Sequence, residues 1–332
     1  MMNNMENSGY KVFLDLQGRA HSDEGYILVE SVPFSTHHKI GTSNEGFPLF
    51  FIKCDNENKS IDINLELISV LFSQECNINE KEKNSNDIFT IVLLKTLNRD
   101  LQQYFTDVFS MILQQLEPIP SEINLYREVR KVIDLFSSIS SPPLKSVQGL
   151  WAELLVIDKA LNPEYLIHAW HISQSDKYDF NDSKDKIEVK STSKSKRIHR
   201  FSIEQLNNNP GSDLLIASTF VIETGSGISV LNLRDNINSK ISDIKLKIRL
   251  NEMIYKTIGN EYEKLSEIFF DYQQASDSLS FYEIINIPLI HVNAIPVQVS
   301  NVIFDCDLTN VPAILENQYD ISDSLLFKSL GI

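Results

Sequence analysis

The segment at residues 178–190 constrains the fold of this chain more than any other. It reads YDFNDSKDKIEVK, with apolar and polar residues alternating on both sides of a polar segment at 182–185. Alternation around Asp, Ser and Lys turn residues is typical of a β-hairpin. If 182–185 form the loop, Asp179 lies opposite Glu188 on the paired strand. The sequence therefore predicts a hairpin with a defined register.

The predicted hairpin brings three charged side chains to one face of a sheet. Residues two apart in a strand share a face, so Glu188 and Lys190 point the same way, and Asp179 joins them from the opposite strand. The intervening apolar side chains then point into a core. Two carboxylates beside an ammonium group suit a hard divalent cation and a phosphate. The alternative is a surface cluster of cross-strand ion pairs, each worth only about 0.2–1 kcal/mol.

The composition is that of a soluble globular protein. A length of 332 residues suggests two domains, and no window approaches the run of about 18 apolar residues that spans a membrane. The N-terminus lacks the basic and apolar regions of a secretory signal. Three scattered cysteines, Cys54, Cys76 and Cys306, form no CxxC pair, which is typical of a reducing compartment. We therefore expect a cytoplasmic protein that does not associate with a membrane.

The charge distribution bears on the class of ligand. A net charge of −15 argues against a general nucleic-acid binder, because contacts to phosphates depend on Lys and Arg. The balance is uneven, since residues 184–200 contain seven Lys and Arg residues against two acidic ones. A run of charge is often only a solvated face. This run borders the predicted hairpin, which is compatible with a protein that binds DNA locally or alongside a partner.

The spacing of apolar residues divides the chain into two domains. Short apolar runs before residue 95, the first at 10–16, predict an antiparallel sheet in the form of a small sandwich or half-barrel. Helical spacing follows at 101–116 and in a second stretch at 121–135. The segment SSISSPPL at 137–144 is a compositional break. The expected domains are a β-rich N-terminal module ending in two helices at 1–140 and a second domain at 141–332.

The second domain alternates helical and extended patterns. A helix is expected from residue 147, with Glu153 among its apolar residues. Burying an acidic side chain beside the apolar stripe of a helix costs free energy unless a cation or a hydrogen-bond donor contacts it. The alternative is that Glu153 lies at the edge of the stripe and is solvated. Residues 214–222 predict a central strand covered on both faces, followed by a turn and a second strand of a hairpin at 228–233.

Glu153, Asp179 and the triplet Glu188-Val189-Lys190 resemble, in this order, the pattern of the PD-(D/E)XK nuclease superfamily, which has the restriction-endonuclease-like fold. In that superfamily, an acid on the first helix, an Asp on a strand and E-x-K on the next strand surround a Mg²⁺ site. The wider runs GLWAELLVI, YDF and IEVKST, followed by RIHRFSIEQL, are similar to a bacterial family of PD-(D/E)XK motif proteins. The resemblance covers nearly the full length of the chain.

The resemblance implies an α/β (α+β) fold, with a restriction-endonuclease-like core whose mixed central sheet is flanked by helices, preceded by the β-rich N-terminal module. It implies a metal-dependent endonuclease that hydrolyses DNA phosphodiester bonds with Mg²⁺, for which Mn²⁺ can substitute, in bacterial restriction or anti-phage defence. The alternative is a catalytically inactive nuclease-fold subunit that binds DNA or partner proteins in a defence complex. A homodimer or other subunits of such a system are the expected partners. One departure is Tyr178, which precedes the Asp where the family pattern has Pro.

The resemblance also implies roles for single residues. Lys190 would orient the nucleophile and stabilise developing charge, and Gln205 resembles a helix glutamine that faces the scissile phosphate in many members. The ligands of Mg²⁺, with the last of them placing a second metal ion or a water, would be Asp179, Glu188, the carbonyl of Val189, and Glu153. The DNA backbone would be held by a basic run that consists of Lys194, Lys196, Arg197, His199 and Arg200.

Overall fold

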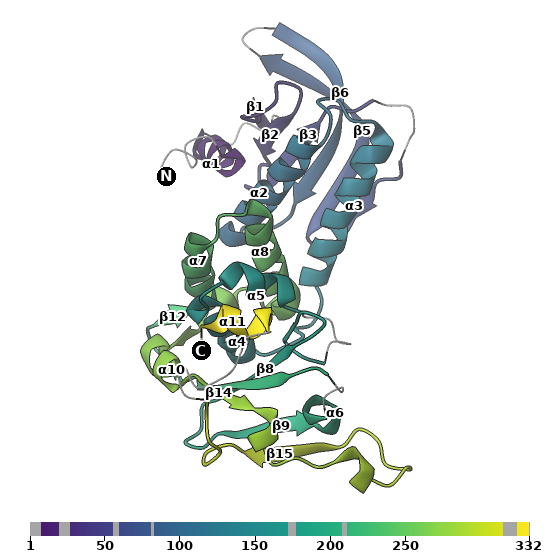
Figure 1. Ribbon diagram of the computed structural model, residues 1–332. Coiled ribbons are helices and arrows are strands. Elements are labelled where there is room, and N and C mark those ends of the chain that lie inside the picture. Colours follow the sequence, from purple (N-terminus) through teal and green to yellow (C-terminus); the bar gives the residue numbers. More distant parts are fainter. Residues whose placement is uncertain are drawn as a thin grey trace. The chain divides into compact units, whose positions relative to one another are not determined.

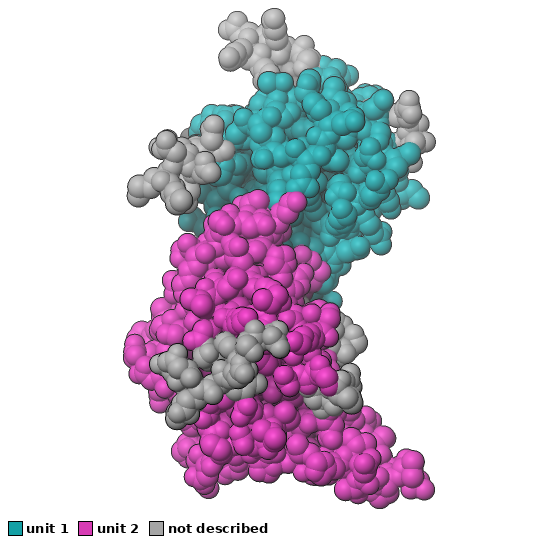
Figure 2. Space-filling view, in the orientation of Figure 1, with its two compact units in different colours: residues 1–141 teal, residues 142–332 magenta. Residues whose placement is uncertain are grey.

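The computed structural model divides the chain into two compact units, residues 1–141 and residues 142–332. Figure 1 shows their helices and strands, and Figure 2 colours the two units separately. The residues that the structure describes are 8–19, 27–55, 60–80, 83–171, 177–207, 211–314 and 324–331.

Unit 1 is built on an antiparallel sheet with the strand order β1-β2-β3-β6-β5-β4. The long β5–β6 pair contains a register shift between Leu71 and Gln74. The described part of this unit forms this sheet and not the expected sandwich or half-barrel. The strands are β1 (Leu28–Ser31), β2 (Lys39–Thr42), β3 (Pro48–Ile52), β4 (Ile63–Asn64), β5 (Ile68–Glu80) and β6 (Lys83–Leu94).

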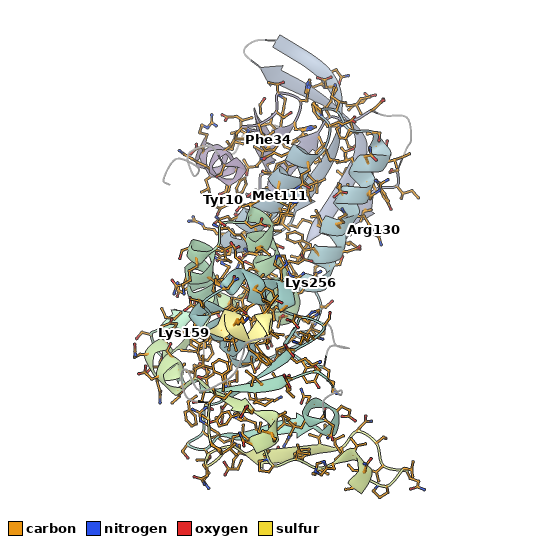
Figure 3. All side chains as sticks on the ribbon, in the orientation of Figure 1. Tyr10, Phe34, Met111, Arg130, Lys159 and Lys256 are labelled. Carbon is orange, nitrogen blue, oxygen red and sulfur yellow. The ribbon has the colours of Figure 1, made fainter. Side chains whose placement is uncertain are left out.

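Two long helices pack against this sheet through aromatic side chains. They are α2 (Arg99–Gln115) and α3 (Glu122–Ile139), close to the two helices that the sequence predicts. Phe105 on α2 contacts Phe50 of β3 and Phe136 of α3, with ring centroids 5.7 Å apart in both cases. Side chains fill the space between helices and sheet, while the exposed Arg130 lies on the outer side of α3 (Figure 3). The predicted helical spacing therefore marks a buried face.

The apolar run at 10–16 is not the strand that we expected. It lies in the helix α1 (Gly9–Arg19), whose buried residues Gly9, Phe13 and Leu16 follow helical spacing. A Cβ added at Gly9 would lie 2.7 Å from Ser110 Oγ, so α1 approaches α2 closely. Because apolar residues follow one another directly in this run, their spacing does not show the helical period clearly.

Unit 2 contains a mixed sheet with the strand order β14-β10-β8-β7. The central strands β8 and β10 are parallel, while β7 and β14 pair antiparallel at the two edges. Nearly every residue of β10 is buried, as predicted for a central strand covered on both faces. The strands are β7 (Phe180–Asn181), β8 (Lys186–Thr192), β10 (Leu214–Phe220) and β14 (Ser280–Glu283).

Helix α4 (Val147–Lys159) packs against β8 and carries the fully buried Trp151. The other helices of unit 2 are α5 (Pro163–Ala169), α6 (Ile203–Leu206), α7 (Val230–Lys240), α8 (Ile244–Ile258), α9 (Lys264–Glu267), α10 (Tyr272–Ser278) and α11 (Leu325–Leu330). No helix in the parts of the chain that the structure describes is long and apolar enough to cross a membrane.

Strand β10 does not form the predicted hairpin with the segment that follows it. That segment begins as the short strand β12 (Ile228–Ser229), which pairs with β13 (Phe269–Phe270), and helix α7 starts at the next residue. Ser229 and Asn232 form a capping box that begins this helix. The partners of β10 come instead from β8 and β14, which are distant in sequence.

The mixed sheet is backed by a second, smaller sheet in which β9 (Ile198–Ser202) pairs antiparallel with β15 (Ile303–Asp307). An apolar cluster joins the two sheets, and its buried members include Tyr178, Phe201, Ile216, Tyr282 and Leu308. Among the described residues, unit 2 thus has an α/β arrangement with a mixed central sheet flanked by helices, which confirms the expected fold class.

Candidate active site

The predicted hairpin is confirmed in strands β7 and β8, where Asn181 pairs with Lys186. The loop between them is shaped by Asp182, whose Oδ1 accepts hydrogen bonds from the backbone N–H groups of Lys184 at 3.0 Å and Asp185 at 2.8 Å. An Asp side chain that bonds its own backbone two residues on is a common turn device. The loop therefore sets the register on which the site depends.

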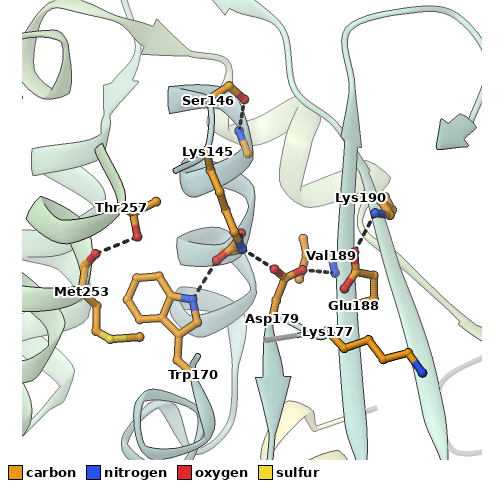
Figure 4. A network of polar contacts seen from close by, with 12 residues as sticks. Lys145, Ser146, Trp170, Lys177, Asp179, Glu188, Val189, Lys190, Met253 and Thr257 are labelled. Carbon is orange, nitrogen blue, oxygen red and sulfur yellow. Dashed lines mark hydrogen bonds and ion pairs between the residues drawn. The ribbon is translucent and has the colours of Figure 1, made fainter. Parts of the chain in front are cut away.

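Asp179 directs its carboxylate at the open edge of β8. Its Oδ2 accepts a hydrogen bond from the backbone N–H of Val189 at 2.7 Å (Figure 4). The N–H and C=O groups of one strand residue point to the same side. The carbonyl of Val189 therefore lies at the same edge as the Asp179 carboxylate, because the short strand β7 does not extend this far.

Glu188 is buried on β8, at 4% exposed. Its Oε1 accepts hydrogen bonds from Lys190 Nζ at 2.6 Å and from Gln205 Nε2 at 2.7 Å. Its Oε2 is buried and has no hydrogen-bond partner among the described residues. A buried carboxylate oxygen without a partner is costly, so this atom is suited to a cation.

Glu153 reaches the site from helix α4 and is 3% exposed. Its Oε2 accepts a hydrogen bond from Trp170 Nε1 at 2.7 Å, and its Oε1 lies 2.5 Å from the ammonium of Lys145. The same ammonium donates to Oδ1 of Asp179. The buried acid is thus met by a cation and a donor, as its burial requires. The sequence analysis did not identify Lys145.

Burial raises the carboxyl pKa of both buried glutamates. It raises the pKa of Glu153 to about 8 and that of Glu188 to about 7, and the negative charge of Asp179 adds to both shifts. Burial alone would lower the pKa of Lys145, but Asp179 and Glu153 raise it above its ordinary value. Three carboxylates with the ammonium groups of Lys145 and Lys190 leave one negative charge at full ionisation. One proton or one metal cation would offset that charge.

No group of three or more His, Cys, Asp or Glu side chains within the described ranges is arranged to hold a metal ion. The oxygens that remain for a cation are Asp179 Oδ2, Glu188 Oε2 and the Val189 carbonyl, because Lys145 and Trp170 engage both oxygens of Glu153 and Lys145 engages the other oxygen of Asp179. Oxygen donors, a negative charge and an unpaired carboxylate oxygen fit a hard divalent cation such as Mg²⁺. The residues present therefore fit the group that the sequence pattern implies.

Gln205 is positioned by the start of the short helix α6. Its backbone N–H donates to Ser202 Oγ at 3.3 Å, and its Oε1 accepts from the Ser202 backbone N–H at 3.1 Å. This capping box leaves Nε2 to donate to Glu188 Oε1. The structure thus brings Gln205 to the site, where its side-chain amide donates to the Glu188 carboxylate.

The basic run divides between the surface and the interior. Lys194, Lys196 and Arg200 are exposed, and Arg200 Nε lies 2.9 Å from Oδ1 of Asp305. Successive residues of β9 face opposite sides, which buries the alternate side chains of the run. The exposed residues are therefore the members of the run that remain accessible from solvent.

Arg197 and His199 do not face solvent, so their expected role as phosphate contacts is corrected. The Arg197 guanidinium donates to Ser218 O at 2.7 Å and to Ser218 Oγ at 2.8 Å, and it lies 4.5 Å from the ring centroid of Phe220. His199 Nε2 lies 2.8 Å from Ser218 Oγ. Burial lowers the pKa of His199 to about 4, so its ring is neutral at pH 7. Both residues hold β9 against β10.

Replacing Arg197 with methionine is expected to lower the free energy of unfolding by about 2–4 kcal/mol, because buried acceptors lose a charged donor. Urea denaturation measures this change. The matched control is Arg200→Met, which removes an exposed ion pair and should leave stability nearly unchanged. Similar stability of the two variants would contradict the buried placement of Arg197.

A mixed sheet flanked by helices, with an Asp directly before one strand and an E-x-K triplet on the neighbouring strand, defines the PD-(D/E)XK nuclease-like class of folds. A family model described as "Putative PD-(D/E)XK family member, (DUF4420)" matches residues 19–309. The chain belongs to this family. Searches among curated proteins and among solved structures gave no match.

Proposed function

We propose that this protein is a metal-dependent endonuclease that hydrolyses DNA phosphodiester bonds. The observation that carries the proposal is the buried Glu188 carboxylate, whose Oε2 has no partner in the described structure. It lies beside Asp179 and Lys190 on the β7–β8 hairpin. Membership of the PD-(D/E)XK family supports the same chemistry, because members of this class usually use divalent metals.

Asp179, Glu188 and the Val189 carbonyl are the residues that would hold Mg²⁺. When bound, the cation would activate a water molecule and neutralise charge on the phosphate. The hairpin keeps these oxygens in place, since the Val189 N–H fixes one oxygen of Asp179 at 2.7 Å. Preorganised ligands of this kind lose little conformational freedom when a cation binds.

Lys190 supplies the positive charge of this chain that faces the reacting phosphate. Its ammonium pairs with Glu188 and lies 5.0 Å from the ring centroid of Phe201, and its side chain is 18% exposed. A partly buried ammonium can orient the attacking water and stabilise charge that develops in the transition state. Gln205 donates to the same oxygen of Glu188 as Lys190 does, and so also holds this carboxylate in position.

The exposed residues Lys194, Lys196 and Arg200 would contact the DNA backbone irrespective of its sequence. Replacing Lys194 and Lys196 together with glutamine should weaken binding to any DNA. It should also reduce the slope of log affinity against log salt by about 1 for each phosphate that the variant no longer neutralises. Fluorescence anisotropy across a salt series measures both effects. Lys264→Gln, which changes an exposed lysine on α9, is the control, and an equal effect in that variant would contradict the assignment.

Plasmid cleavage tests the proposed function. Supercoiled DNA incubated with the purified protein and Mg²⁺ or Mn²⁺ should become nicked or linear, and EDTA should prevent this. Cleavage that persists in EDTA would contradict a metal-dependent site. DNA binding without cleavage would favour the alternative of a catalytically inactive nuclease-fold subunit in a defence complex.

We further propose that the activity serves bacterial restriction or anti-phage defence, on the basis of the family resemblance. Cutting both strands of a duplex in one binding event would use two active sites, one for each strand. We therefore expect a homodimer or an assembly with other subunits, and light scattering of the protein bound to DNA measures this.

A further inference from the structure

Lys145 places an ammonium group between two carboxylates of the site. Its Nζ lies 2.5 Å from Glu153 Oε1 and also donates to Asp179 Oδ1 (Figure 4). The residue precedes Ser146, the N-cap of helix α4, and lies outside the segments that carry the PD-(D/E)XK pattern. An ordinary lysine is fully charged at pH 7. The fold therefore builds a positive charge into this position.

A metal ion shared by Glu153 and Asp179 would need the position that this ammonium occupies. One oxygen of Glu153 accepts from Trp170 Nε1 at 2.7 Å, so the other oxygen, which faces Lys145, is the one left for a cation. An ammonium in contact with both carboxylates excludes a metal ion that would bridge the same two oxygens. The Lys145 ammonium thus supplies positive charge at the position that a second metal ion would occupy.

A different position remains on the other side of Asp179. There, Glu188 Oε2 is buried without a partner in the described structure, and the Glu188 side chain is 5% exposed. The Asp179 oxygen on this side contacts only a backbone N–H among the described contacts, and the Val189 carbonyl lies at the same edge. Glu188 Oε2 is therefore free to bind a cation at this position, together with the Asp179 oxygen and the Val189 carbonyl.

We propose that Lys145 makes this a one-metal site, in which a single divalent cation binds at Asp179 and Glu188 while the Lys145 ammonium replaces a second cation between Glu153 and Asp179. The inference rests on the proposed function, which places one cation at Asp179 and Glu188. It adds that no second cation binds between Glu153 and Asp179. The charges agree with it. When all three carboxylates are ionised, they and the two ammonium groups sum to one negative charge, so one divalent cation leaves one positive charge, which matches a single DNA phosphate.

The number of Mn²⁺ ions bound by the full chain tests this inference. Calorimetric titration should find one Mn²⁺ per chain in the wild-type protein. Lys145→Met removes the ammonium while keeping a side chain of similar length, and it should bind a second Mn²⁺. Lys145→Arg keeps the charge and should bind one. The double variant Lys145→Met/Glu153→Gln should also return to one, because the second position loses a ligand.

Two Mn²⁺ ions on the wild-type protein, or a count on Lys145→Met equal to that of the wild type, would overturn the inference. If Lys145→Met does not fold, the wild-type count decides alone. Failure of the proposed function is distinguishable, because the count does not depend on DNA cleavage. A wild-type chain that binds one Mn²⁺ and gains a second in Lys145→Met supports the inference even if it cuts no DNA. A chain that binds none overturns both.

Discussion

Replacing Lys190 with methionine is expected to lower Mg²⁺-dependent DNA cleavage about 100- to 1000-fold, the usual loss when one preorganised donor to a developing charge is removed. The ammonium pairs with Glu188 at 2.6 Å and sits over the Phe201 ring, so its position is fixed before substrate binds. Methionine keeps the apolar contact with the ring. Initial rates of plasmid nicking measure the effect.

The matched control for this variant is Lys186→Met. Lys186 lies on the same strand and the same face as Lys190, and it is 7% exposed. Its ammonium donates to Ser212 Oγ and lies within 3.4 Å of the Lys184 carbonyl, and so points away from the acidic residues. The control should keep cleavage within a few fold of the wild type. Full activity of Lys190→Met, or an equal loss in both variants, would contradict the role of Lys190.

Replacing Glu188 with glutamine is expected to abolish metal-dependent cleavage and to stabilise the metal-free protein at pH 8. The pKa of Glu188 is raised from 4.5 to about 7 in the folded protein, chiefly by burial. A carboxyl group with a raised folded pKa stabilises the fold fully below pH 4.5, and that contribution is lost as the pH rises through 7. The ionised Glu188 should therefore cost about 1–3 kcal/mol at pH 8.

Urea denaturation of metal-free protein at pH 5 and pH 8 measures this linkage. The wild-type protein should lose stability between these pH values, and Glu188→Gln should lose less. Added Mg²⁺ should restore stability at pH 8 in the wild type only, because ligand binding to the folded state stabilises it. Glu204→Gln, at an exposed position on α6, should behave as the wild type. A Glu188→Gln variant that is less stable than the wild type at pH 8 would contradict this account.

The hairpin could be predicted because its determinants are local. Alternation on both sides of a four-residue polar loop specifies strands, register and faces together. The register of Asn181 with Lys186 follows from the loop length, and the burial of Ile187 follows from the alternation. Glu153 could be predicted for a similar reason, since its place on a buried helix stripe demanded a partner.

Lys145 could not be predicted, because its contact with Asp179 spans 34 residues and depends on tertiary packing. The available signal was indirect, since a buried Glu153 requires a cation near it. Arg197 and His199 are a different case. Period-two alternation places both on the same face as the apolar Phe201, which would have indicated their burial before the structure was known.

The pairing of β10 also lay beyond the sequence analysis. The segment after residue 228 has the apolar character of a strand, but the capping box of Ser229 and Asn232 starts a helix there. The pattern S-x-x-N was available as a signal for a helix start. The partners of β10, in contrast, lie far away in sequence and are chosen by burial of both faces of this strand.

Anomalous scattering from crystals grown with Mn²⁺ would test the central claim most directly. We expect one peak bound by carboxylate oxygens of Asp179 and Glu188 and by the Val189 carbonyl, at the short metal–oxygen distances typical of a small divalent cation. Lys145 should remain between Glu153 and Asp179. Mn²⁺ bound only elsewhere on the protein, with Glu188 Oε2 turned to a protein donor, would contradict the assignment of this hairpin as a metal-dependent nuclease site.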